Sequence, residues 1–572
     1  MLFLRLISAV FLGTVCATGF AQSGVSFVGG AWSGNVSATT ATVTIRLNTA
    51  GVRVRLQVSQ NESLTPAVFS PAVTTAAGSG HTAKLTIQGL QPDTDYYYGI
   101  EVAGALRTET VSRGRFRTFP LGKSSFRIAF GSCGDFRAAD QSAYDAIMRE
   151  RPLLFINMGD LHYSDTNSTN AEDYRANYDN VTGHREQGAL YRSVPMAYVW
   201  DDHDFSGNDS DTTSLGRDTA RQIYRERVPH YAIGPTGGSI GQAFTIGRVR
   251  FIMTDLRSAS SPATQKDNAS KTKMGTAQKS WFKQELINAR DNGFPLVVWV
   301  NPDPWIGAAV AGEDTWQGYT TERTEIANFI RDNRISNLVV LSGDMHGLAV
   351  DDGTNSDYAT GGGAPLTVLH AAALTSNSSM KGGPYSGGVF SGSQQYGILE
   401  VYDNGSDSVA CRFLGKKVGE GAKLTHIFSG STKGSKDHAI VNISTLARIA
   451  SGDDALVSGF VISGASERRV LVRAIGPTLA AFGINDALAR PILTVQQGSR
   501  LVATNTSWAG ATPAATEAIL DAFDRAGAFR LVDENSRDTV LLLSLAPGPY
   551  TVQVKSGDGT PGATLLEVYD LP

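Results

Sequence analysis

Cysteine is scarce in this chain, with only three among 572 residues. Cys16 lies in an apolar N-terminal stretch, so Cys133 and Cys411 are the two that belong to the rest of the chain. Two cysteines are too few for a disulfide-stabilised scaffold. They could form one bridge, or Cys133 could instead be a metal ligand, and sequence position favours neither alternative.

The chain also lacks an excess of charge of either sign. Its 50 lysines and arginines nearly balance 54 aspartates and glutamates, which gives a formal net charge of −4. A balanced chain offers no support for a specific nucleic-acid partner or an anionic membrane surface. Beyond the N-terminal stretch, no apolar run reaches the ~20 residues that a membrane-spanning helix requires.

Residues 1–22 have the layout of a secretory signal peptide. One early cation, Arg5, precedes an apolar stretch that ends near Val15, and small residues follow at Gly19 and Ala21. The stretch is shorter than the ~20 apolar residues of a membrane anchor, and polar sequence follows it, which favours cleavage over anchoring. We therefore expect a secreted protein, periplasmic or extracellular.

Residues 23–120 alternate apolar and polar side chains in short runs, as in residues 41–47 and 52–58. This period of two is typical of β-strands. The segment from Leu90 to Tyr96 resembles the corner before a tyrosine-rich strand in fibronectin type III domains. We predict a fibronectin type III-like β-sandwich over residues 23–120.

The pattern changes to α/β over residues 125–414, where buried apolar strands such as 126–130 alternate with helical patterns such as 276–292. Residues 415–436 are rich in Gly, Lys and Ser, which predicts a linker. Strand alternation returns over residues 437–572 and predicts a separate C-terminal β-sandwich module of unknown role.

Residues that bind metals or handle protons follow six apolar strands of the α/β segment. They are Cys133, Asp160, Asp201 to Asp204, Asp255, Asn301 with Asp303, and Asp344 with His346. In an open α/β sheet, such strand ends line one crevice. A single aspartate there is more often a turn or cap residue, but adjacent Asp201 and Asp202 are costly to hold near a site unless a cation offsets them. The six together predict one metal site.

The order of these motifs resembles that of the calcineurin-like metallophosphoesterases, and within them the alkaline phosphatase D (PhoD-like) family. The matching residues are Cys133, Gly159-Asp160-x-x-Tyr163, Asp202-His203-Asp204, Asn301 and Gly343-Asp344-x-His346. The resemblance covers the α/β segment and, more loosely, the preceding β-sandwich. It does not cover the C-terminal module.

The resemblance implies a two-metal centre in which Asp160 bridges the ions. Cys133, Tyr163 and His346 would complete a ferric site, since thiolate and phenolate donors suit a highly charged, partly soft metal. Asp202 and Asp344 would hold a second ion, Ca²⁺, because both offer hard oxygens.

The resemblance also implies the remaining roles. His203 would protonate the leaving group as a catalytic residue, and Asp204 would orient its ring. Asn301 takes the place where many relatives have a metal-binding histidine. No Gly-x-Ser-x-Gly elbow or phosphate-cradling loop indicates a protein nucleophile. Family members often carry a twin-arginine signal, whereas this N-terminus has only Arg5, which favours general secretion.

The predicted function is therefore hydrolysis of phosphate mono- or diesters by a metal-activated water. One alternative is a non-catalytic surface or glycan-binding protein built around a decayed phosphoesterase domain, with the C-terminal module contacting a cell surface or glycan. Intact Asp160, Asp202, His203 and His346 argue against such decay. Another alternative is hydrolysis of a different ester with the same metals. The sequence does not distinguish monoesters from diesters.

Overall fold

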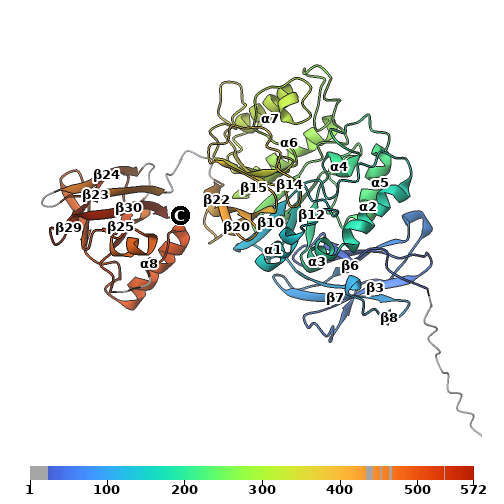
Figure 1. Cartoon of the computed structure of the whole chain (residues 1–572), viewed down its shortest axis with the longest axis horizontal. Coiled ribbons are helices and arrows are strands. Elements are labelled where there is room, and N and C mark those ends of the chain that lie inside the picture. Colours follow the sequence, from blue (N-terminus) through green and yellow to red (C-terminus); the bar gives the residue numbers. More distant parts are fainter. Residues whose placement is uncertain are drawn as a thin grey trace, which may run out of the picture.

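The computed structural model describes three β-rich regions, which follow one another along the chain, and the first two share a sheet (Figure 1). The described residues are 24–432, 442–450, 454–462, 467–531, 533 and 535–571. The predicted signal peptide lies outside them. Within the described part of the chain, no helix is long and apolar enough to cross a membrane.

Residues 24–120 form two groups of antiparallel strands around a shared apolar core. The elements are β1 (Trp32–Gly34), β2 (Thr40–Arg46), β3 (Arg53–Ser59), β4 (Val68–Phe69), β5 (Val73–Thr74), η1 (Ala77–Ser79), β6 (Thr82–Gln88), β7 (Asp95–Val102), β8 (Ala105–Leu106), η2 (Thr110–Ser112) and β9 (Arg113–Arg117). Strand β3 pairs with β4, β5 and β7, and β7 pairs with β8 and β9. At the corner before β7, the Gln91 amide donates a hydrogen bond to the Tyr96 hydroxyl at 2.9 Å.

The remaining strands of this region, β1, β2 and β6, belong to a sheet that continues into the central domain. Strand β1 pairs in parallel with β12 (Met196–Tyr198), with Gly34 opposite Met196. A Cβ atom on Gly34 would lie 2.6 Å from the Met196 carbonyl oxygen, so the close approach of these two strands requires glycine. The N-terminal strands and the strand that leads to Asp201 are thus one continuous sheet.

The central domain packs a nine-stranded sheet against a seven-stranded sheet. Its strands are β10 (Phe126–Gly131), β11 (Phe155–Asn157), β12, β13 (Gln242–Ile246), β14 (Val249–Met253), β15 (Leu296–Asn301), β16 (Leu338–Ser342), β17 (Gly347–Asp351), β18 (Thr367–Ala371), β19 (Val389–Ser391), β20 (Gln395–Tyr402), β21 (Ser408–Lys417) and β22 (Gly421–Ser431). Its helices are α1 (Ser142–Glu150), α2 (Ala171–Gly183), α3 (Arg185–Ser193), α4 (Asp202–Phe205), α5 (Arg217–Arg227), α6 (Thr276–Asp291), η3 (Trp316–Gly318) and α7 (Thr320–Asp332).

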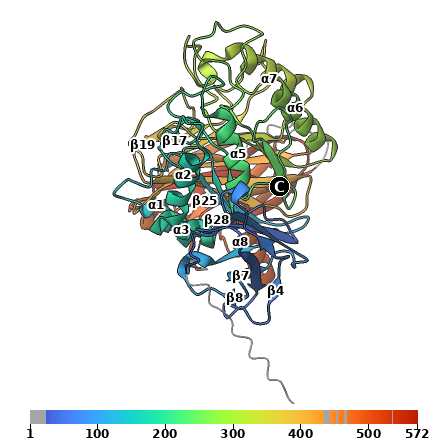
Figure 2. The same cartoon turned by 90° about the vertical axis from the view of Figure 1, so that its right-hand side faces the viewer.

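The six predicted strand ends do not belong to one open sheet, as we expected, but to both sheets. Strands β10, β11 and β12 are parallel neighbours in the larger sheet, and β14, β15 and β16 are parallel neighbours in the smaller one. Alternate side chains of the two sheets, such as Phe130 and Leu341, share one buried core between them. Helices α6 and α7 cover the outer face of the smaller sheet, at the end of the molecule opposite β7 and β8 (Figures 1 and 2).

The predicted linker over residues 415–436 is wrong for most of its length. Strand β21 extends to Lys417, and β22 pairs with it as the edge strand of the nine-stranded sheet. Leu424 and Phe428 pack against the core, whereas Thr425 and Ile427 between them are exposed. The central domain therefore continues to about residue 432 and not to 414.

The C-terminal module has two four-stranded sheets and one helix that the sequence pattern did not predict. The elements are β23 (Asn442–Ile449), β24 (Ala455–Ile462), β25 (Arg468–Ile475), η4 (Pro477–Phe482), β26 (Pro491–Gln497), β27 (Arg500–Asn505), α8 (Pro513–Ala526), β28 (Thr539–Leu545), β29 (Gly548–Ser556) and β30 (Gly562–Leu571). Thr512 caps α8 by accepting a hydrogen bond from Ala515, and Phe523 packs onto Trp508.

We predict that a chain ending at Thr432 folds like the intact central domain, whereas one ending at Leu414 does not. The shorter chain loses β22 and the end of β21, which exposes the core under Leu424 and Phe428. Thermal unfolding of the two truncated chains beside the full chain checks this. Equal transitions for both truncations would contradict the place of β22 in the sheet.

Candidate metal centre

The ends of β10, β11, β12 and β16 bring the predicted ligands together where the two sheets meet. One group consists of Cys133, Asp160 and His346, whose ligand atoms lie within 4.8 Å of one another. Tyr163 joins this group: its hydroxyl donates to Asp160 Oδ2 at 2.9 Å and lies 3.1 Å from His346 Nε2. Thiol, carboxylate, phenol and imidazole donors thus converge as the motif order predicted.

The tautomer of His346 follows from its other ring nitrogen. His346 Nδ1 lies 2.6 Å from the Asn377 carbonyl oxygen, which can only accept. Nδ1 therefore carries the proton, and the lone pair of Nε2 faces Tyr163 and Asp160. A backbone carbonyl that fixes the ring in this way is the usual partner of a metal-binding histidine.

Asp160 belongs to a second group as well. Its carboxylate lies within 4.8 Å of ligand atoms of both Asp202 and His203. Among the described residues, no hydrogen-bond partner reaches Asp160 Oδ1, although this atom is buried. A carboxylate shared by two ligand groups, with one oxygen free, has the position of a bridging ligand.

Burial makes these carboxylates expensive without a cation. Burial, together with the charges of Asp202, Asp204 and Asp344, raises the pKa of Asp160 well above its usual range. Burial also raises the pKa of Asp344 to about 6, although Lys381 opposes that shift. Asp344 Oδ2 is likewise buried with no hydrogen-bond partner in the described part of the chain. A bound cation would satisfy both free oxygens and return the carboxylates to their charged form, so these residues fit a metal centre.

Cys133 is a thiol and not half of a disulfide. Cys133 and Cys411 are both buried and free in the described part of the chain. Cys411 lies in the apolar core of the large sheet, whereas Cys133 lies among polar side chains such as Asp160 and His346. Burial, followed by the charge of Asp160, raises the pKa of the Cys133 thiol, so thiolate at this position also requires a nearby cation.

Three predicted ligands have left-handed backbone conformations, which side-chain-bearing residues seldom adopt. The φ angles are 62° at Cys133, 51° at Asp160 and 58° at Asp344, each just after a strand. Such conformations persist only where the surroundings impose them, and they concentrate at functional sites. Gly159, which precedes Asp160, cannot be replaced by a residue with a side chain without a clash, because a Cβ atom there would lie 2.4 Å from the Asp201 Cβ.

His203 is oriented by Asp165 and not by Asp204, which corrects the prediction. His203 Nδ1 lies 2.6 Å from Asp165 Oδ1, and the His203 ring lies 4.2 Å from that of Tyr163, centroid to centroid. The Asp204 carboxylate instead accepts hydrogen bonds from the Tyr198 hydroxyl at 2.6 Å and the Leu161 amide at 2.9 Å. Asp204 thus holds the backbone beside Asp160, and nothing in the spacing of Asp165 distinguished it from an ordinary loop aspartate.

Asn301 makes its hydrogen bonds within the smaller sheet and its loops. The Trp316 indole donates to Asn301 Oδ1 at 2.8 Å, and Asn301 Nδ2 donates to the Asp303 carbonyl at 2.6 Å. Among the described residues, none of its hydrogen bonds reaches Asp160 or Asp344. The buried polar side chain of Asn301 is therefore already satisfied within the smaller sheet and its loops.

Asp202 lies at the start of α4 with both oxygens held by backbone amides. Oδ1 accepts from His203 and Oδ2 accepts from Asp209, each at 2.8 Å. Asp202 approaches Asp160 within the second ligand group, whereas Asp344 is grouped with Asp201 and Asp303. Asp202 and Asp344 nevertheless lie close enough for the charge of Asp202 to raise the pKa of Asp344.

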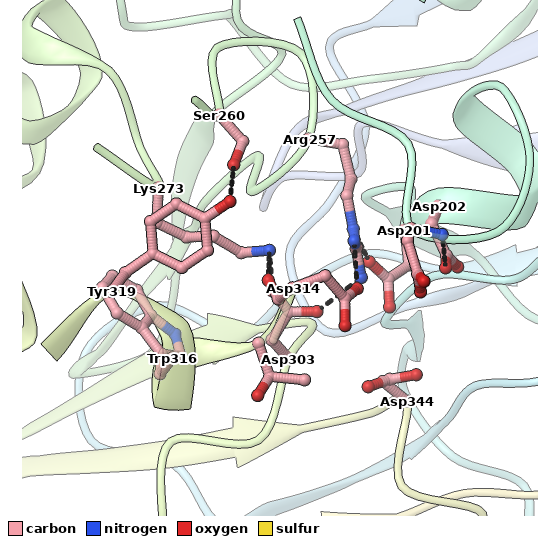
Figure 3. A network of polar contacts seen from close by, with 12 residues as sticks. Asp201, Asp202, Arg257, Ser260, Lys273, Asp303, Asp314, Trp316, Tyr319 and Asp344 are labelled. Carbon is pink, nitrogen blue, oxygen red and sulfur yellow. Dashed lines mark hydrogen bonds and ion pairs between the residues drawn. The ribbon is translucent and has the colours of Figure 1, made fainter. Parts of the chain in front are cut away.

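Next to Asp202 and Asp344 lies a buried ion-pair network around Arg257, which sequence analysis missed (Figure 3). Arg257 pairs with Asp201, with Asp314 at 2.6 Å and with Asp303 at 2.8 Å. Lys273 lies 2.5 Å from the other oxygen of Asp303. Arg257 and Lys273 are almost fully buried, so they neutralise carboxylates inside the protein. Through Asp201, Arg257 also fixes the segment between β12 and α4, where Asp202 begins the helix.

Comparisons with known proteins agree with the geometry. The family model described as PhoD-like phosphatase matches residues 128–398, and the model of the N-terminal domain of PhoD-like phosphatases matches residues 14–120. A curated relative, alkaline phosphatase D of Bacillus subtilis (strain 168), is 23% identical over 343 residues, which are 52% of this chain and 58% of that protein. A solved structure of PhoD has a TM-score of 0.58 and 19% identity, covering 71% of this chain and 91% of that one. The latter similarity shows a shared fold.

We predict that Arg257→Leu lowers the free energy of unfolding by about 3–5 kcal/mol, because it leaves Asp201, Asp303 and Asp314 with less neutralising charge in a buried place. Chemical denaturation in the presence of a chelator measures the loss separately from metal binding. Arg290→Leu is the matched control: its ion pair with Asp291 is exposed, and its removal should cost about 0–1 kcal/mol. Similar losses for both variants would show that the buried network contributes no more to the free energy of unfolding than an exposed ion pair.

Proposed function

We propose that this chain, which belongs to the PhoD-like phosphatase family, is a secreted, metal-dependent phosphoesterase that hydrolyses phosphate esters by attack of water. The observation that supports this most strongly is Asp160, whose carboxylate is shared by two ligand groups and has one buried oxygen free. The signal peptide that export requires lies outside the described residues, so secretion rests on the sequence pattern.

The donor sets suggest two different ions. Cys133, Tyr163 and His346 with Asp160 would hold Fe³⁺, because soft and anionic donors surround that position. Asp202 and Asp344 would hold Ca²⁺ through hard carboxylate oxygens. When bound, such a pair of ions supplies a nucleophilic water and neutralises charge on the phosphoryl oxygens.

His203 is placed to hold and deliver a proton. Because Asp165 takes Nδ1, the Nε2 atom is the one that can give a proton to the departing oxygen of the ester. The contact with the Tyr163 ring limits rotation of the imidazole. Asp204 supports the same site indirectly, because its carboxylate accepts a hydrogen bond from the Leu161 amide, next to Asp160.

We assign no chemistry to the flanking regions. The strand pairing of residues 24–120, with three strands in one sheet and β3, β7 and β9 in the other, supports a fibronectin type III-like β-sandwich. The C-terminal module has its own apolar cores, which supports a separately folded module. Contact with a cell surface or glycan is the role we propose for it from the sequence alone. The alternative of a decayed, non-catalytic domain is disfavoured because Cys133, Asp160 and His346 converge in one ligand group.

We predict that Asp160→Asn abolishes ester hydrolysis and lowers the metal content of the purified protein, since both ions would share this carboxylate. Elemental analysis and hydrolysis of chromogenic phosphate esters measure the two effects, and circular dichroism confirms the fold. Asp211→Asn, in an exposed turn of the 205–216 loop, is the control and should change neither. Retained metal together with retained turnover would refute the two-metal proposal.

We predict that Asp165→Asn lowers kcat by about 10- to 100-fold with unchanged metal content, because His203 loses the charged acceptor that orients its ring and stabilises its protonated form. The loss should be largest for esters of poorly acidic alcohols, whose departing oxygen needs the proton most. Comparing nitrophenyl and alkyl phosphates measures this difference. A uniform loss on both, or a loss of metal, would mean that Asp165 serves the fold or the ligands.

A further inference from the structure

Lys381 is a partly exposed cation in contact with Asp344, one of the predicted ligands. It lies in the loop between β18 and β19, and its ammonium nitrogen is 2.7 Å from Asp344 Oδ1. About 30% of its side chain is exposed, compared with 4% for Asp344. Lys381 therefore joins a buried predicted ligand to a side chain that solvent can partly reach.

The neighbouring cations are engaged by other groups of the protein to a greater extent than Lys381. Arg257 and Lys273 are each 1% exposed and already paired with buried carboxylates. Arg137 donates from Nε and Nη2 to Asp135, and from Nη2 to the Tyr163 carbonyl oxygen, at 2.7 to 3.2 Å. Lys381, in contrast, has three N–H donors, of which Asp344 accepts one.

The loop that carries Lys381 is the same loop that orients His346. The Asn377 carbonyl oxygen lies 2.6 Å from His346 Nδ1, and the Ser379 carbonyl accepts from the His346 amide at 2.9 Å. The Tyr385 hydroxyl then donates to the Lys381 carbonyl at 3.0 Å. Lys381 is thus held at a fixed place relative to a predicted ligand, although it lies 35 residues further along the chain.

The charge of Lys381 acts across the site. Asp344, Asp314 and Asp202 all lie close enough to interact with it electrostatically, and it acts in turn on His346. These residues belong to both sides of the centre. A phosphoryl group bound between the two sides would therefore place a non-bridging oxygen near the ammonium nitrogen.

We propose that Lys381 is a substrate-binding residue that contacts a non-bridging phosphoryl oxygen and selects phosphomonoesters over phosphodiesters. This inference rests on the proposed function. A monoester carries close to two negative charges above its second pKa of ~6, whereas a diester carries one. A lysine at this place acts as a point charge, so its attraction grows with the charge of the phosphoryl group.

A purely structural role makes a different prediction. If Lys381 only neutralised Asp344, its removal would change metal content or affect mono- and diesters equally. If it recognises the dianion, its removal raises KM for the monoester and weakens inhibition by inorganic phosphate, while the diester is much less affected.

The experiment compares the full-length, metal-loaded wild type with Lys381→Met and Lys381→Arg on nitrophenyl phosphate and bis(nitrophenyl) phosphate. These esters have the same leaving group and differ in charge. For Lys381→Met, we expect kcat/KM on the monoester to fall by about 10- to 100-fold, the size of a charge-assisted hydrogen bond, and the monoester-to-diester ratio to fall by about tenfold. Lys381→Arg should restore part of that ratio because it keeps the charge.

Lys283→Met is the matched control, because Lys283 forms a surface ion pair with Glu325 away from the centre. Metal content and thermal unfolding are measured for every variant, and Lys381→Gln replaces Lys381→Met if the latter does not fold. An unchanged monoester-to-diester ratio in an active enzyme overturns the role of Lys381. A wild type inactive on both esters with both metals bound refutes the proposed function itself.

Discussion

Buried negative charge at the meeting place of two sheets is the constraint on which the rest of the centre depends. Asp160, Asp202 and Asp344 are all nearly inaccessible to solvent, and like charges in such a place repel one another strongly. Arg257 pairs with the neighbouring Asp201, and Lys381 pairs with Asp344. Asp160 and Asp344 each keep one buried oxygen without a hydrogen-bond partner in the described part of the chain, and the proposed metal ions would bind there.

The same constraint explains the unusual backbone. Each predicted ligand follows the end of a buried strand and must point toward a common position. If the strand continued with extended backbone, the side chain would lie beyond that position. A left-handed residue at the strand end turns the chain within one position, as at Cys133 and Asp160. The cost of that conformation is offset by the packing of the strands before it, which are buried on both faces.

The N-terminal strands contribute to the centre through the sheet itself. Because β1 pairs with β12, the strand that leads to Asp201 and Asp202 has a neighbour on each side. Strand β12 is hydrogen-bonded along both edges, unlike an edge strand, so the backbone that leads to Asp201 and Asp202 is held on both sides. The N-terminal region therefore supports the centre even though it supplies none of its donors.

Much of this protein could be determined from its sequence alone, because strands and ligand motifs are local patterns. Apolar runs followed by Cys133, Asp160 or His346 identify both the element and the donor at its end. Only the tertiary structure decided how those ends are divided between two sheets, and that β22 completes one of them in place of a linker. It also decided the partners of the motif residues: Asp165 beside His203, Arg257 behind Asp201, and Lys381 beside Asp344. Each of these pairs joins residues 37 to 56 positions apart. At such separations the partner is set by which loops pack together, and that packing leaves no periodic trace in the sequence.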